Sequence, residues 1–375
     1  MPYLSDMYHD QNRRRRAERD GSDNGADGAP VAAEARRPPG SFDASAVARR
    51  LSARVIGQDH AVAAVVRALV LARAGAHDPD RPLANLLLVG PTGVGKTELV
   101  RRVAAELRSG PDDLCRVDMN ALAQEHYAAS FSGAPPGYAG SKEAFSLFDP
   151  TTVEGDPYTP GIVLFDEVEK AHPTVLRALL HVLDSGTLRL ASGQKTISFR
   201  NTFVFLTSNL GSAELARRRG ARWRRVLDRA GRPLRLDGVA GRLAAKGNDA
   251  AVGDALRGFF DPEFLNRIDE TVVFEELDRP ACARIAAAET ELLTRRLRRR
   301  GVELTVDEAV VALLAESGFD PVYGARGLRR ELRTLLATPV AEELLRVRPS
   351  GTDQVRMTAT VRDGQVCVGA VDAEG

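Results

Sequence analysis

The chain alternates short apolar runs with longer segments in which apolar residues recur every three or four positions. The first pattern is typical of buried strands and the second of amphipathic helices. We predict strands at 86–89, 114–118, 162–166, 203–207 and 271–274. Helical spacing marks 42–51, 60–74 and 173–183. Apolar strands that alternate with helices predict an α/β fold with a five-stranded, mostly parallel sheet covered on both faces.

The two ends of the chain differ from this α/β region. Residues 1–41 are rich in Gly, Asp, Ala, Arg and Pro and lack apolar periodicity, so we expect a disordered tail. After Asp278-Arg279-Pro280, helical spacing returns at 281–299, 306–317 and 328–345, and a closing hairpin is predicted for 355–360 with 365–368. We therefore expect a large α/β domain over 42–278 and a small helical domain over 279–375 that ends in a hairpin.

Composition narrows the class of protein only a little. The 52 basic and 51 acidic residues almost balance, so net charge gives no reason to expect nucleic acid or a membrane surface as a partner. The three cysteines lie far apart, which fits reduced thiols. No stretch approaches the roughly 18 apolar residues of a membrane span, and we expect a soluble, cytoplasmic protein.

A glycine-rich loop between the first predicted strand and a helix carries the strongest chemical signal. Residues 90–97 read Gly-Pro-Thr-Gly-Val-Gly-Lys-Thr, the pattern of a loop whose backbone N–H groups and helix dipole cradle phosphates. Lys96 would reach the β- and γ-phosphates of ATP, and the Thr97 hydroxyl would ligate Mg²⁺. The predicted nucleotide-binding residues are Pro91, Thr92, Gly93, Val94, Gly95, Lys96 and Thr97.

Two other predicted strands deliver polar residues to the same edge of the sheet. The apolar run 162–165 ends in Asp166 and Glu167. Asp166 would hold Mg²⁺, and Glu167 would polarise the water that attacks the γ-phosphate. The run 203–207 is followed by Asn209, which would orient that water or contact the γ-phosphate. Together with the loop, these residues predict ATP hydrolysis.

The complete set of motifs resembles the AAA+ ATPases of the Clp family, and most closely the second ATPase module of ClpB-type disaggregases. The resemblance extends from about residue 45 to 348. In addition to the phosphate loop, the resemblance rests on these stretches: 55–59 (VIGQD), 133–140 (GAPPGYAG), 164–172 (LFDEVEKAH), 199–201 (FRN), 207–211 (TSNLG), 262–269 (PEFLNRID) and 320–326 (DPVYGAR).

The resemblance implies roles for further residues. Arg267 matches the arginine finger, which acts on the nucleotide of a neighbouring subunit, so a homo-oligomeric ring, a hexamer, is expected. Arg326 matches the sensor arginine of the C-terminal lid. Val55 and Ile56 match the residues that contact adenine.

Tyr138 and the following Ala139 match the pore loop that grips an extended polypeptide, although the family usually has valine in the place of Ala139. The alternative for Tyr138 is a side chain that packs this loop onto the body of the protein. The resemblance thus implies an ATP-dependent unfoldase or remodelling chaperone that threads a protein substrate.

Two features depart from the family. ClpB-type proteins carry an N-terminal domain, a first ATPase module and a coiled-coil domain, whereas only the expected tail precedes this module. The resemblance therefore does not extend to adaptor binding through these domains or to disaggregation with a partner chaperone. No Ile-Gly-Phe or Leu-Gly-Phe tripeptide for docking a peptidase lies between Gly211 and Asp261. We therefore expect no role as the unfoldase of a Clp protease.

An expected basic insertion at 216–247 contains nine arginines and Trp223 within 216–235. It would suit an adaptor, an acidic partner or nucleic acid, and a solvated arginine-rich helix explains it equally well. Two alternatives to the unfoldase remain open: a nucleic-acid-dependent motor or loader that uses this insertion, and a scaffold whose assembly ATP regulates.

Overall fold

The computed structural model of the protein describes residues 42–124, 147–156, 158–189, 196–211, 252–319, 324–347 and 355–371. Except for Phe42, these residues belong to one compact unit, Asp43–Gly375. The predicted disordered tail, pore loop and basic insertion lie outside the described residues. Within the described ranges, no helix combines the length and the apolar character that a membrane span requires.

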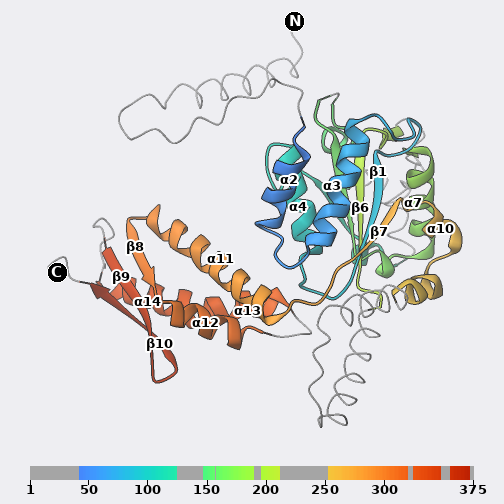
Figure 1. Ribbon diagram of the computed structural model, residues 1–375. Coiled ribbons are helices and arrows are strands. Elements are labelled where there is room, and N and C mark those ends of the chain that lie inside the picture. The colour runs from blue at the N-terminus through green and yellow to red at the C-terminus, as the bar shows by residue number, and fades with distance from the viewer. Residues whose placement is uncertain are drawn as a thin grey trace, which may run out of the picture. The chain divides into compact units, whose positions relative to one another are not determined.

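A five-stranded parallel sheet organises the α/β region (Figure 1). Its strand order is β2-β3-β6-β1-β7. The strands are β1 Ala84–Val89, β2 Cys115–Asp118, β3 Gly161–Asp166, β6 Thr202–Ser208 and β7 Glu270–Val273. All five predicted strands are confirmed within two residues at either end. Because β1, β3 and β6 are buried along their whole length, each reads in the sequence as an apolar run.

Helices cover both faces of this sheet, as expected (Figure 1). On one side lie α2 Ala44–Ser52, α3 Asp59–Arg73 and α4 Lys96–Leu107; on the other lie α7 Pro173–Ser185 and α10 Pro262–Asn266. Val175, Leu179 and Val182 of α7 pack into a core with alternate residues of β1, β3 and β6. The short elements are η1 Met119–Leu122, α6 Pro150–Glu154, η3 Val168–Lys170, β4 Thr187–Arg189 and β5 Thr196–Ser198.

The C-terminal residues form a second core of their own, built around Ala286, Leu314 and Met357. Its elements are α11 Arg279–Arg298, β8 Val302–Val306, α12 Glu308–Ser317, α13 Ala325–Glu331, a π-helical segment Leu332–Ala337, α14 Thr338–Val347, β9 Val355–Arg362 and β10 Gln365–Val371. The predicted domain boundary near Asp278 stays a prediction; the side chain of Asp278 caps the first turn of α11.

The expected closing hairpin is present, but it belongs to a three-stranded sheet of order β10-β9-β8. The sequence analysis did not predict the third strand, β8, which lies parallel to β9. Val302 and Leu304 are buried while Glu303 between them is exposed, so a strand signal of period two was present. The expected helix at 306–317 begins only at Glu308, because Val306 ends β8.

Candidate functional site

The phosphate loop leaves β1 and enters α4 at Lys96. Gly95, with φ of +110°, precedes the helix in a conformation that glycine adopts readily. Lys96 is only 8% exposed, and its ammonium group donates hydrogen bonds to the carbonyl oxygens of Gly90 and Pro91 and to Oδ1 of Asn209 at 2.8 Å. The lysine is therefore held at the C-terminal edge of the sheet, where the sequence predicts the phosphates.

The carboxylates of Asp166, the last residue of β3, and of Glu167, which follows it, lie close enough to raise the pKa of this lysine. The Thr207 hydroxyl donates to Oδ1 of Asp166 at 2.5 Å and accepts a hydrogen bond from the backbone N–H of Glu167 at 2.9 Å. Glu167 adopts φ of +60°, a left-handed conformation that is uncommon for a residue other than glycine. Strain of this kind persists where the surrounding structure fixes the backbone, and it often marks a functional site.

Asn209 connects the lysine to the predicted catalytic carboxylate. Its Oδ1 accepts from Lys96, and its Nδ2 donates to Oε1 of Glu167 at 3.4 Å. The backbone N–H of Asn209 donates to Glu169 at 3.1 Å, which fixes the end of β6 against the end of β3. The structure thus brings Lys96, Asn209 and Glu167 into one connected set, as the sequence predicts.

The residues predicted to hold Mg²⁺ offer hard oxygen ligands. Asp166 is 9% exposed, and the half-buried Thr97 follows Lys96 in the first turn of α4. Oδ2 of Asp166 accepts two hydrogen bonds from the guanidinium of Arg116, at 2.5 and 3.1 Å. The Asp166 carboxylate and the Thr97 hydroxyl are hard oxygen ligands of the kind that Mg²⁺ prefers, and phosphate oxygens would complete such a site.

The first turn of α13 meets the phosphate loop directly. The N–H of Ala325 donates to the carbonyl oxygen of Gly93 at 3.0 Å. A Cβ at Gly324 would lie 2.8 Å from the same oxygen, so this approach requires glycine. Arg326 comes next in α13, and its positive charge lowers the pKa of Lys96, which places it within electrostatic reach of the loop. The predicted sensor arginine therefore lies at the site.

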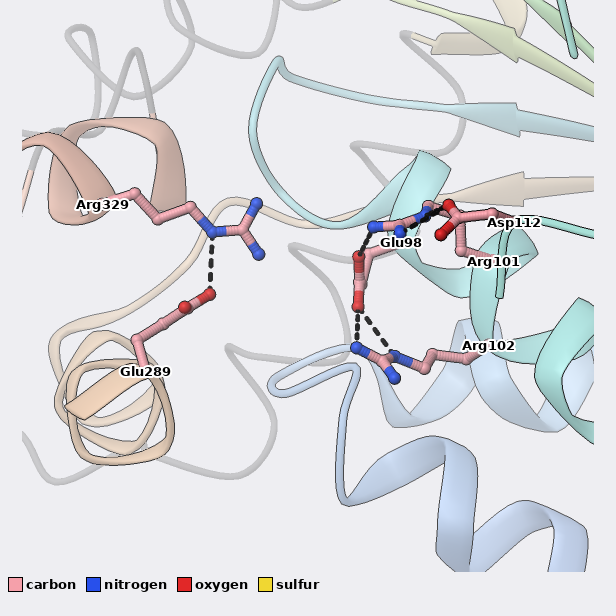
Figure 2. Close-up of polar contacts among 6 residues, drawn as sticks. All are labelled: Glu98, Arg101, Arg102, Asp112, Glu289 and Arg329. Carbon is pink, nitrogen blue, oxygen red and sulfur yellow. Dashed lines mark hydrogen bonds and ion pairs between the residues drawn. The ribbon is translucent and has the colours of Figure 1, made fainter. Parts of the chain in front are cut away.

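Ion pairs fix the two helices that carry these groups (Figure 2). One turn after Arg326, Nε of Arg329 donates to Glu289 of α11 at 2.7 Å, which ties α13 to the longest helix of the C-terminal region. In α4, Glu98 accepts from Arg102 at 2.7 Å and from Arg101, which also bonds Asp112. The two pairs of Glu98 lie within α4 itself, and the contact with Asp112 joins the helix to the segment that follows it.

Val55 lies against the loop from the other side, because a Cβ on Gly95 would be 3.7 Å from its Cγ1. Val55 and Ile56 are 3% and 8% exposed. Their assignment to adenine remains a prediction, supported for Val55 by this contact. Tyr138 and Ala139 lie outside the described residues.

Arg267 lies away from Lys96, Asp166 and Glu167. Its carbonyl oxygen accepts a hydrogen bond from Asn85, the second residue of β1, whereas the phosphate loop follows the last residue of that strand. At about 3.3 Å per strand residue, Asn85 and Gly90 are roughly 16 Å apart. The guanidinium of Arg267 pairs with Asp184 at 2.8 Å. The structure therefore does not bring this residue into its own chain's phosphate site.

Several residues at the site were not given a role by the sequence analysis. Thr207 and Glu169 lie inside quoted motifs, but only the fold shows that they hold Asp166, Glu167 and Asn209 in place. Arg116 precedes the buried Val117 in β2 and is one of many arginines in the chain. No signal in the sequence distinguishes it.

The pKa of Lys96 gives a test of the site. Burial lowers this pKa from 10.5 to about 8; Glu169, Asp166 and Glu167 oppose the effect, and Arg326 adds to it. A bound triphosphate favours the charged ammonium, so binding takes up a proton wherever the unliganded site is partly deprotonated. We expect uptake of roughly 0.1, 0.5 and 0.9 proton at pH 7, 8 and 9, measured by titration calorimetry in buffers of different ionisation enthalpy. Uptake that stays constant over this range would contradict the lowered pKa.

Comparisons with known proteins give two family matches. Residues 81–271 match the family model described as an AAA domain of the Cdc48 subfamily. Residues 277–357 match the model described as the C-terminal, D2-small domain of ClpB protein. The two matches meet between residues 271 and 277, next to the predicted boundary at Asp278.

Individual proteins agree with these matches. An "ATP-dependent protease ATP-binding subunit-like protein" of Rhodococcus erythropolis is 59% identical over 98% of this chain and 99% of its own length. The chaperone protein ClpB of Meiothermus ruber is 41% identical over 79% of this chain, which spans 32% of that relative. A closed-state cryo-EM reconstruction of Hsp104 with ATPγS and FITC casein has a TM-score of 0.67 at 30% identity, over 87% of this chain and 51% of that one.

Proposed function

The chain belongs to the AAA+ ATPases related to ClpB, and on that premise we propose that it unfolds or remodels proteins by drawing polypeptide through the pore of a homo-hexameric ring. Nucleotide binding and ATP hydrolysis are properties of this family. To these family properties the proposal adds a protein substrate, a homo-hexameric ring, Mg²⁺ as the metal ion and a cytoplasmic location. The nucleic-acid and adaptor roles of the 216–235 stretch stay predictions.

The connected set of Lys96, Asn209 and Glu167 carries the proposal. Lys96 would bind the β- and γ-phosphates, and Glu167 would accept a proton from the attacking water. Asn209 would hold Glu167 at a fixed distance from Lys96. Thr97 and Asp166 would hold Mg²⁺, which neutralises charge on the phosphates.

Arg267 supports the ring. A guanidinium near the far end of β1 is poorly placed for its own chain's phosphates, yet it is half-exposed and is available to a neighbouring copy. An arginine supplied from another subunit stabilises the charge that develops on the transferred phosphoryl group. Each site would therefore be complete only in the assembled ring.

The relationship to proteases is a separate question. The Rhodococcus relative is named as a protease subunit-like protein, whereas the docking tripeptide is missing between Gly211 and Asp261. We propose an unfoldase without a Clp peptidase. Its substrates should then be released intact after ATP-driven unfolding when purified peptidase is present; their degradation would contradict this part of the proposal.

Replacement of Tyr138 with alanine tests the threading of protein. We expect ATP turnover close to that of the wild type, together with loss of ATP-driven unfolding of a tagged fluorescent reporter. The reason is that an aromatic side chain on a glycine-rich loop supplies grip without touching the nucleotide. The measurements are phosphate release and the decay of reporter fluorescence.

Tyr158→Ala is the matched control, because Tyr158 is 87% exposed on a loop elsewhere in the chain. It should unfold the reporter at the wild-type rate. Binding of FITC casein, the ligand named for the Hsp104 structure, gives a second measurement. Unchanged unfolding by Tyr138→Ala would contradict the pore role and leave the alternative in which Tyr138 packs the loop onto the body.

A further inference from the structure

We propose that Asp184 is a positioning residue for Arg267 and orients its guanidinium toward the nucleotide of the next chain. This inference rests on the proposed function, in which Arg267 acts on a neighbouring copy. Asp184 is the penultimate residue of α7, and Arg267 follows α10. The two residues are thus brought together only by the fold.

The ion pair leaves room for a second anion. Oδ1 of Asp184 lies 2.8 Å from Nη1 of Arg267, and the two side chains are 46% and 36% exposed. A guanidinium carries five N–H donors in a planar fork, so a carboxylate at one terminal nitrogen leaves other donors for a phosphate. The contact limits the rotation of the arginine without removing it from solvent.

A single buried side chain fixes the backbone on both sides of this pair. Nδ2 of the fully buried Asn85 donates to the carbonyl oxygens of Leu183 and Arg267, both at 3.0 Å. Leu183 immediately precedes Asp184. The amide of Asn85 therefore sets the separation of the two chain segments from which the acid and the arginine extend.

Arg81 repeats this bridge. Its guanidinium donates to the same two carbonyl oxygens, that of Arg267 at 3.0 Å and that of Leu183 at 3.4 Å, and pairs with Asp269 at 3.3 Å. Asp269 in turn accepts from the backbone N–H of Asn85 at 2.7 Å. The backbone at Arg267 is thus held from several directions, and the side chain is left to be oriented by Asp184.

An ion pair this exposed adds little to folding stability, because both charges stay largely hydrated. Its effect should instead appear in catalysis, since small displacements of a catalytic group have large effects on rate. Arg257 and Asp254 form a comparable exposed pair at 2.7 Å within a single helix. That pair provides a control with the same residue types.

The first test separates catalysis from binding. Asp184→Ala should lower kcat for ATP by about 10- to 100-fold with little change in KM, because Arg267 would be present but misoriented. Asp184→Asn keeps an acceptor oxygen and should recover part of the loss, while Asp254→Ala should match the wild type. In an Arg267→Ala background, Asp184→Ala should lower kcat no further. An equal loss in both backgrounds would overturn the inference.

Mixed rings separate this inference from the function on which it rests. Arg267→Ala copies keep an intact site and lack the finger, whereas Glu167→Gln copies keep the finger and lack the base. We expect mixtures of the two variants to regain ATP turnover. The regained rate should fall about tenfold when the Glu167→Gln copies also carry Asp184→Ala. Size-exclusion chromatography should confirm that all variants assemble together. If Glu167→Gln copies restore turnover equally with and without Asp184→Ala, the role of Asp184 is overturned while the action of Arg267 on a neighbouring copy stands. If neither kind of copy restores turnover, both the action of Arg267 on a neighbouring copy and this inference are overturned.

Discussion

Replacing Glu167 with glutamine is expected to lower ATP turnover by about 10²- to 10⁴-fold while ATP binding stays unchanged. Glutamine has the same shape and keeps the Oε1 atom that accepts from Asn209, so the surroundings of the site remain intact. It loses the basicity needed to take a proton from water. Phosphate release measures turnover, and titration with a fluorescent ATP analogue measures binding.

Glu308→Gln provides the control, since Glu308 is an exposed glutamate in the first turn of α12. It should turn over ATP like the wild type. The Glu167 variant should also hold protein substrates in a stalled ring, and a pull-down with it should identify them. A variant that keeps its cellular function without hydrolysis would instead favour the ATP-regulated scaffold.

Lys96→Ala should weaken ATP binding by roughly 10- to 100-fold, because hydrogen bonds to a charged group contribute about 1.5–3 kcal/mol each. The variant loses the ammonium group at the phosphates and, with it, the contact that orients Asn209. If assembly requires ATP, the ring should be lost as well. Titration calorimetry and light scattering after size exclusion, both with ATP present, measure the two effects.

Arg102→Ala is the control for Lys96→Ala, because it also removes a positive charge from α4. Arg102 pairs with Glu98 of the same helix. It should bind ATP as the wild type does. Equal weakening in both variants would show that total charge on α4, rather than the placement of Lys96, determines affinity.

The five-stranded sheet was predictable because burial on both faces gives parallel strands a simple sequence pattern. Strands β1, β3 and β6 each contain a run of four apolar residues, and polar residues or glycine stand at the ends of these runs. Strand β8 was missed although its residues alternate with period two, because it has only five residues and follows a 20-residue helix closely. Its partner β9 comes some fifty residues later in the chain, so local pattern gave no indication of the pairing.

The candidate site also contains residues that local sequence motifs predict and residues whose role depends on the fold. Lys96, Asp166 and Glu167 were predicted because each lies at or just beyond the end of a strand, within a motif of fixed spacing. The residues that hold such groups in place depend on contacts between distant segments. Asn85 reaches Leu183 and Arg267 across 98 and 182 residues, and its sequence position marks it only as a polar residue in an apolar strand.

Strand β1 carries the phosphate loop beyond its C-terminal end, while Asn85 near its N-terminal end holds the backbone of Arg267. In a closed ring of identical chains, one short strand would thus join the nucleotide of its own chain to the arginine serving the next. Because such coupling is reciprocal, the nucleotide of one copy would affect the arginine that the copy presents to its neighbour, and engagement of that arginine would affect the nucleotide in return.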